Sequence, residues 1–264
     1  MGVLNVTPDS FYDGGRYQTE SAILNHVEKL LGEGALFIDV GAYSSRPGAT
    51  DISAEEESNR ALFALRTIMR NFPDALVSID TFRSDVAYAA VNEGACLVND
   101  ISAGDLDPKM FETIARLNVP YIAMHMRGNP TTMNTLTGYE NLLKEMVAYF
   151  QDKINRLAQF GVKDVIIDPG FGFAKTAEQN FYLLNQLDYF KLLGKPIAVG
   201  LSRKSIIWKT LSITADNALN GTTSLNTIAL MKGANILRVH DVKEAMEVVK
   251  LVSALRNNSN ALVY

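Results

Sequence analysis

The sequence has 264 residues, 47% of them hydrophobic, and a formal net charge of -4. Such a chain can bury a large core, as one large α/β domain or as two small ones, and its acidic balance argues against nucleic acid or an anionic membrane as the main partner. No apolar run reaches the length of a membrane-spanning helix, and the single cysteine, Cys96, excludes an intrachain disulfide and is typical of a reducing cytoplasm.

Eight short apolar segments along the chain are predicted to be β-strands, and amphipathic patterns such as 21–31, 54–69 and 141–160 are predicted to be helices between them. The predicted strands are 3–6, 36–40, 75–79, 96–98, 121–124, 165–167, 197–199 and 235–239. Eight β-α units of this length predict an α/β fold, a (β/α)8 TIM barrel, as one domain spanning 1–264. A doubly wound sheet is the alternative, but no GxGxxG follows the first strand.

Each predicted strand is followed by polar residues at its C-terminal end. In chain order these are Asn5, Asp39, Asp80, Asn99 with Asp100, His125, Asp168, Ser202 to Lys204, and Arg238 with His240. One such residue is most simply a turn or a cap, but eight of eight are hard to explain by turns alone. A barrel brings these ends to one face, where active sites of this fold lie, so we predict the active site there.

The late strands bring cations close to a predicted helix start at Ser205. Arg203, Lys204, Arg238 and His240 together with backbone N–H groups favour an anionic, phosphorylated ligand. The alternative is that Arg203 and Arg238 pair with carboxylates of the barrel.

Asp80, Asn99 and Asp168 come from three other strand ends and form an acid and amide set. Carboxylates and amides suit a flat heterocycle with adjacent N–H groups, such as a guanine or a pterin, and the residue types alone leave both open.

No HExxH, CxxC or EF-hand spacing appears, although Asn5 with Asp9 or Asp13 could offer oxygen ligands to Mg²⁺ shared with a diphosphate. His125 either satisfies a buried hydrogen bond or acts directly.

Several segments resemble the dihydropteroate synthase family, in the family's order and over essentially the whole chain. They are NVTPDSF at 5–11, SSRPGA at 44–49, SIDTFR at 78–83, NDISAG at 99–104, IDPGFGFAK at 167–175, GLSRKS at 200–205 and RVHDV at 238–242. The resemblance implies a TIM barrel that joins 6-hydroxymethyl-7,8-dihydropterin diphosphate to 4-aminobenzoate, giving 7,8-dihydropteroate and diphosphate in folate synthesis.

The resemblance also implies a role for individual residues. Asp80, Asn99, Asp168 and Lys204 would hold the pterin, with Met124 also in the substrate pocket, and Asn5, Arg238 and His240 would hold the diphosphate, with Asn5 also touching Mg²⁺. Ser45, Arg46 and Pro47 correspond to the second substrate loop, and Phe173, Lys204 and Ser205 to the aminobenzoate pocket, which sulfonamides would share. The segment from 5 to 15 resembles a loop that closes over substrates, which places Phe11 on aminobenzoate.

The implied mechanism is a dissociative substitution. Diphosphate leaves first, aided by Mg²⁺, Arg238 and His240, and a delocalised carbocation remains near Asp80 and Asp168 before the amine attacks. Asp9 or Asp13 would assist the metal or accept the amine proton. The family further implies a homodimer that assembles through helices away from the barrel mouth, and the single cysteine leads us to expect a cytoplasmic protein.

The chain departs from the family at Tyr43, Ser45 and Ala174, where Glu, Thr and Gly are frequent, and the additional residues that many members carry before the first strand are expected to be missing.

Three other functions are alternatives to the one that the resemblance implies. They are a pterin-binding methyltransferase domain, which would not need the SSRPG, GLSRKS and RVH segments, a Schiff-base aldolase using Lys204, and a non-catalytic pterin-binding protein.

Overall fold

The computed structural model describes residues 1–7, 20–44 and 51–258. Phe11, Ser45, Arg46 and Pro47, which are predicted to contact substrates, lie outside the described residues, as do Asp9 and Asp13.

Eight parallel strands close into a barrel. They are β1 (Gly2–Asn5), β2 (Phe37–Gly41), β3 (Leu76–Asp80), β4 (Leu97–Asp100), β5 (Tyr121–Met124), β6 (Val165–Asp168), β7 (Ala198–Val199) and β8 (Ile236–Leu237). Strands β1 to β6 pair in sequence order and β7 pairs with β8. Parallel bridges between Ile167 and Ile197 and between Gly2 and Val239 join the two sheets into a ring, which confirms the predicted TIM barrel.

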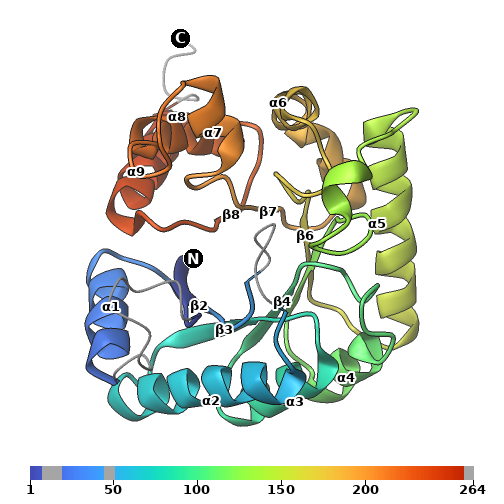
Figure 1. Cartoon of the computed structure of the whole chain (residues 1–264). Helices are drawn as coiled ribbons and strands as arrows, with labels where there is room; N and C mark the ends of the chain where they lie inside the picture. The colour runs from blue at the N-terminus through green and yellow to red at the C-terminus, as the bar shows by residue number, and fades with distance from the viewer. Residues whose placement is uncertain (8–19, 45–50, 259–264) are drawn as a thin grey trace.

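The helices form an outer layer around this ring (Figure 1). They are α1 (Glu20–Gly32), α2 (Ala54–Asn71), α3 (Ser84–Asn92), α4 (Met110–Leu117), α5 (Leu142–Gln159), α6 (Ala177–Asn185), α7 (Ser205–Thr210), α8 (Leu219–Met231) and α9 (Val242–Asn258), with short 3₁₀ helices η2 (Met133–Thr135) and η3 (Leu187–Leu193). The three helices predicted from periodicity are present, with bounds that agree within two residues.

Helix α2 shows how the local sequence sets these elements. Ser53 precedes the helix, and its hydroxyl accepts a hydrogen bond from the Glu56 N–H at 3.1 Å, while acids fill the first turn. The apolar residues Ala61, Leu65 and Ile68 recur at helical spacing and are fully buried in the main core, which packs the helices against the strands.

The inside of the barrel is built in two layers. A small apolar cluster contains Leu97, Ile122 and Ala198, with Met1, Phe37, Ile166 and Ile236 packed against it. Because side chains alternate along a strand, the residue two positions later points to the same side. Two positions after Phe37, Leu97, Ile166 and Ile236 stand Asp39, Asn99, Asp168 and Arg238. The barrel interior is therefore closed by an apolar layer below, and polar side chains form the layer above it at the C-terminal ends of the strands.

Candidate active site

Arg238 lies at the centre of this polar layer. Its Nε donates to Oδ2 of Asp39 at 2.6 Å, and its terminal NH2 nitrogen donates to Oδ2 of Asp80 at 2.7 Å. The Asn99 side-chain amide also donates to Oδ2 of Asp39, at 3.2 Å. Four strand ends, β2, β3, β4 and β8, thus meet in one hydrogen-bonded cluster.

The electrostatics of this cluster follow from burial. Burial raises the pKa of Asp80 to about 7, and the nearby Arg238 guanidinium opposes that rise. The pKa of Arg238 is raised, because the attraction of Asp39 and Asp80 outweighs the effect of burial. Asp39 is completely buried, and among the described residues its Oδ1 has no hydrogen-bond partner. Asp80, with a pKa of about 7, can therefore change its charge near neutral pH.

Lys204 stands at the other side of the mouth, at the residue that precedes α7. Its Nζ donates to the Phe171 carbonyl oxygen and lies 4.9 Å from the centre of the Phe173 ring. Burial lowers the pKa of Lys204 to about 8, and Asp168 opposes this shift. Burial raises the pKa of Asp168, and Lys204 opposes that shift in turn, so the two groups stabilise each other's charged forms.

The two halves of the mouth adjoin each other at Gly200. A Cβ at this glycine would lie 3.8 Å from Lys204 Nζ and 3.9 Å from Arg238 Cβ. Asp168, Lys204 and Arg238 therefore surround one site rather than separate cavities. Met124 and Phe173 belong to one apolar cluster beside it, which provides an apolar wall.

His240 is oriented by the end of β7. Its backbone N–H and its ring Nδ1 both lie within hydrogen-bonding distance of the Ser202 hydroxyl, at 3.1 Å and 3.0 Å. Ser202 is buried, so this contact fixes the imidazole ring at the barrel rim. Ser205 begins α7, as predicted.

The two arginines predicted to form a cationic pocket both pair with acids. Arg203 donates from Nε and NH2 to the two carboxylate oxygens of Asp241, at 2.9 Å and 2.8 Å, and from NH1 to the carbonyl oxygens of Ala215 and Asp216. Arg203 therefore has a structural role, whereas Arg238 pairs with acids inside the mouth. Both arginines thus form the carboxylate pairs of the alternative, and a phosphate ligand at Arg238 stays a prediction.

His125 is buried and contacts Lys175, not a site carboxylate. Its Nδ1 lies 3.0 Å from Nζ of Lys175, and burial lowers the pKa of the ring well below its usual value. The structure agrees with the reading in which His125 satisfies a buried hydrogen bond.

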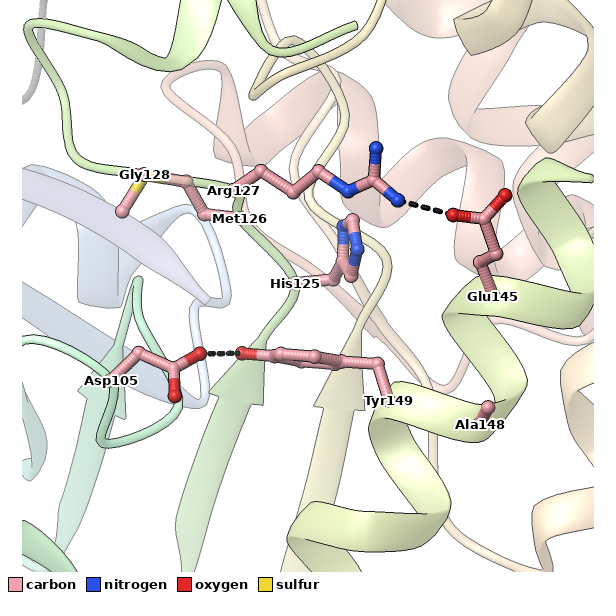
Figure 2. A pocket seen from close by; sticks show the side chains of 8 residues that line it. All are labelled: Asp105, His125, Met126, Arg127, Gly128, Glu145, Ala148 and Tyr149. Atoms are coloured by element: carbon pink, nitrogen blue, oxygen red, sulfur yellow. Dashed lines mark hydrogen bonds and ion pairs between the residues drawn. The ribbon is translucent and has the colours of Figure 1, made fainter. Parts of the chain in front are cut away.

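A separate cavity of about 630 Å³ lies between the loop after β5 and α5 (Figure 2). Its lining residues are Asp105, His125, Met126, Arg127, Gly128, Glu145, Ala148 and Tyr149. Arg127 forms an ion pair with Glu145 there, and the Tyr149 hydroxyl donates a hydrogen bond to Asp105 at 3.0 Å. Asp105 also forms an ion pair with Lys153. None of the described residues that the sequence assigns to a substrate lines this cavity.

Asn5 is the residue predicted to touch Mg²⁺. A Cβ at Gly41 would lie 3.3 Å from Asn5 Oδ1 and 3.6 Å from Asp80 Oδ2, so the amide oxygen lies at the mouth near the Asp80 carboxylate. Within 1–7, 20–44 and 51–258, no three His, Cys, Asp or Glu side chains are grouped as a metal site. Among the described residues, the amide oxygen of Asn5 fits a Mg²⁺ ion that is held mainly by a substrate diphosphate and needs few protein ligands.

Comparison with known proteins decides the family. The model of the family described as pterin binding enzyme matches residues 1–240. The chain is 42% identical to the dihydropteroate synthase of Synechocystis sp. over 97% of this chain and 89% of that protein. It is also 42% identical to the folic acid synthesis protein fol1 of Pneumocystis carinii, of which it spans only 35%.

The chain belongs to the family of pterin-binding enzymes.

Solved structures agree with this family assignment. A Yersinia pestis dihydropteroate synthase solved with a sulfonamide drug has a TM-score of 0.91 and 37% identity, covering 97% of this chain and 93% of that one. A Thermus thermophilus dihydropteroate synthase solved with 4-aminobenzoate has a TM-score of 0.86 and 35% identity, with coverage of 97% and 93%. The resemblance of this pterin-binding family member to dihydropteroate synthases, which are transferases, is confirmed.

Two residues of this family member were not assigned a role from the sequence. Asp39 was recognised only as a strand end, although its position two residues after the apolar Phe37 places it in the inner polar layer. Lys175 closes the IDPGFGFAK segment, and nothing in its position marks a lysine that turns back into its own loop.

Proposed function

We propose that this chain condenses 6-hydroxymethyl-7,8-dihydropterin diphosphate with 4-aminobenzoate, releasing diphosphate and forming 7,8-dihydropteroate. The observation that carries the proposal is the meeting of Asp80, Asn99, Asp168, Lys204 and Arg238 at one barrel mouth. The relatives named as dihydropteroate synthases support it, since they cover nearly the whole chain.

The acid and amide side of the mouth would bind the pterin. Asp168 and Asp80 offer carboxylate oxygens to ring N–H groups, Asn99 offers an amide, and Lys204 can donate to a ring carbonyl. Met124, which is buried in the adjoining apolar cluster, would pack on the flat ring.

The basic side would bind the diphosphate. Arg238 would donate from its guanidinium, which carries five N–H groups and so can serve a phosphate while remaining paired with acids. His240, oriented by Ser202, would add a second donor, and Asn5 would contribute an oxygen to a Mg²⁺ ion that neutralises charge on the leaving diphosphate.

The second substrate, 4-aminobenzoate, would lie beside Lys204, between Phe173 and the start of α7. Phe173 offers an aromatic face 4.9 Å from Lys204 Nζ, and Ser205 at the start of α7 offers a hydroxyl to the carboxylate of 4-aminobenzoate. Phe11, Ser45, Arg46 and Pro47, which lie outside the described residues, remain predicted contacts. A sulfonamide would compete for the same place.

In the proposed reaction, the protein stabilises the charges that develop on the two substrates. The bond between the pterin methylene carbon and the diphosphate oxygen breaks first, and its electron pair leaves with the diphosphate toward Arg238 and His240. The positive charge left on the pterin lies near Asp80 and Asp168, and the amine nitrogen of 4-aminobenzoate then forms the new bond to the methylene carbon. That nitrogen gives up one proton as the bond forms, and Asp9 or Asp13, outside the described residues, is its predicted acceptor. Preorganised charges in a partly buried site lower the barrier to both steps.

We also propose where the protein acts and how it assembles. No helix in the described part of the chain is long and apolar enough to cross a membrane, and we propose a cytoplasmic enzyme. We propose a homodimer because large apolar side chains are exposed on neighbouring outer elements, including Phe181 and Tyr182 of α6 and Ile228 and Met231 of α8. Light scattering on the purified protein tests the assembly.

The decisive experiment mixes the two substrates with Mg²⁺ and the purified protein. Release of diphosphate together with dihydropteroate, and inhibition by a sulfonamide, is the expected result. Binding of pteroic acid without turnover would instead indicate a pterin-binding protein, and borohydride trapping of a carbonyl substrate on Lys204 would indicate an aldolase.

A further inference from the structure

Lys175 is a buried lysine that points into the loop following β6. Its side chain is 8% exposed, and its Nζ lies 3.1 Å from the Gly170 carbonyl oxygen, 3.0 Å from the Phe173 carbonyl oxygen and 3.0 Å from Nδ1 of His125. An ammonium group has three N–H donors, and here three acceptors surround it. Lys175 therefore has no donor left for a substrate.

The tautomer of His125 follows from this arrangement. When Lys175 is charged, its ammonium group donates to the Nδ1 lone pair, and this assigns the ring proton to Nε2. Burial lowers the pKa of Lys175 to about 7, and Asp168 opposes that shift, so the carboxylate helps to keep the lysine charged. Lys175 and Asp168 interact electrostatically although no hydrogen bond between them is recorded.

The loop held by Lys175 carries much of the mouth. It begins at Asp168, whose Oδ1 accepts the Gly170 N–H at 2.8 Å. The Phe171 carbonyl in the same loop accepts from Lys204, and the Phe173 ring lies beside that lysine. Asp168, Lys204 and Phe173 thus depend on the path of one short segment.

The loop follows a specific backbone path that packs closely on the end of β5. Gly170, Gly172 and Ala174 have φ values of +68°, +80° and +50°. A Cβ on Gly170 would lie 2.1 Å from the His125 carbonyl oxygen, so the loop packs directly on the end of β5. The backbone N–H of His125 also donates to the Asp168 carbonyl at 2.9 Å.

We propose that Lys175, with His125 as its acceptor, is a positioning residue that holds the 168–173 loop so that Asp168 and Lys204 meet the pterin together. This inference rests on the proposed pterin site. Lys175 acts through the carbonyl groups of Gly170 and Phe173 and does not touch the substrate itself.

The test compares Lys175→Met with Lys153→Met. Lys153, on α5, is also a buried lysine, 3% exposed, but its ion pair is with Asp105, which lies between β4 and α4 and outside the 168–173 loop. Binding of pteroic acid is measured by calorimetry, with thermal melting as a check on folding. Lys175→Met is expected to weaken binding by about 10- to 100-fold, because small misplacements in a binding constellation have effects of that size, and Lys153→Met is expected to leave it unchanged.

A pair of substitutions at His125 separates positioning from a loss of packing. His125→Asn retains an oxygen acceptor near the place of Nδ1, whereas His125→Leu removes it. We expect His125→Asn to keep most of the affinity and His125→Leu to lose it, even if Lys175→Met fails to fold. Equal losses in the two His125 variants would overturn the role of the acceptor.

Comparison with Asp168→Asn tests whether Lys175 acts on binding through the loop that carries Asp168. If Lys175 acts through the loop that carries Asp168, the losses from Lys175→Met and Asp168→Asn are less than additive in the double variant. Loss of binding in Asp168→Asn with wild-type binding in Lys175→Met would overturn the positioning role alone. Normal binding in both Asp168→Asn and Lys204→Ala would overturn the proposed pterin site and this inference with it.

Discussion

Arg238 and Asp39 form the deepest ion pair of the barrel mouth, with 2.6 Å between Nε and Oδ2. Asp39 is completely buried, so its charge depends on this partner and on Asn99 rather than on water. The same guanidinium reaches Asp80, and one side chain therefore joins the proposed pterin side of the mouth to the proposed diphosphate side.

Removal of this cation is expected to leave Asp39 uncompensated. Arg238→Met should lower the free energy of unfolding by about 3–5 kcal/mol, the usual cost of breaking a buried pair, and should strongly reduce turnover. Urea unfolding measures the first effect. Asp39→Asn added to Arg238→Met should recover part of the lost stability, and Lys29→Met, which breaks an exposed pair with Glu33, should change it by less than about 1 kcal/mol. A fully stable Arg238→Met protein would contradict the argument.

Lys204→Ala and Phe173→Ala are expected to separate the two substrates. Lys204 faces both Asp168 and the Phe171 carbonyl, so its removal should weaken pteroic acid or pterin binding by about 100-fold or more. Phe173→Ala should chiefly raise KM for 4-aminobenzoate. Calorimetry with each ligand and steady-state kinetics measure the split, and equal losses for both ligands in both variants would refute it.

The pH dependence should follow Asp80 and Lys204. Asp80, with a pKa of about 7, gains its charge as the pH rises, so kcat/KM for the pterin substrate should increase through that pH. Lys204, with a pKa of about 8, loses its charge above that value, so kcat/KM should then fall. The expected profile is a narrow bell.

Variants distinguish these groups from ionisation of the substrate. Asp80→Asn should remove the rising limb from whatever activity remains, and Lys204→Arg should move the falling limb to higher pH because a guanidinium stays protonated. A rising limb that persists in Asp80→Asn would assign it to the diphosphate of the substrate.

Gly170→Ala and Gly161→Ala offer a matched test of the loop after β6. Both glycines have positive φ, +68° and +84°, and each alanine should cost roughly 1–2 kcal/mol from backbone conformation. Within the described part of the chain, no atom lies within 4 Å of a Cβ placed at Gly161, whereas a Cβ at Gly170 would meet the His125 carbonyl oxygen at 2.1 Å. Gly170→Ala should therefore lose clearly more stability in thermal melts and also lose pterin binding. Similar melting temperatures for the two variants would show that the loop can move.

The barrel and the position of its site could be predicted because both depend on local patterns. Apolar runs marked all eight strands, and polar residues at their ends marked the mouth, since parallel strands of a barrel end on one face. Asp80 and Asp168 proved to be the last residues of their strands and not the first of the loops, a shift of one residue that leaves their role unchanged.

The partners within the mouth could not be predicted in the same way. Asp39 and Arg238 are separated by 199 positions, and their pairing depends on which residues of β2 and β8 reach the same height in the barrel. Lys175 turns back into its own loop through a run of positive φ values that no periodic pattern encodes. Both features depend on tertiary geometry, which residue types alone do not specify.

The ring of strands closes where Val3 donates its N–H to the Val239 carbonyl, and Val239 donates to that of Met1. Arg238 stands beside this seam. During synthesis the acids of the early strands are made long before the base that neutralises them, and they remain without it until the eighth strand has emerged. The complete charged centre can thus form only once the eighth strand is available to close the ring.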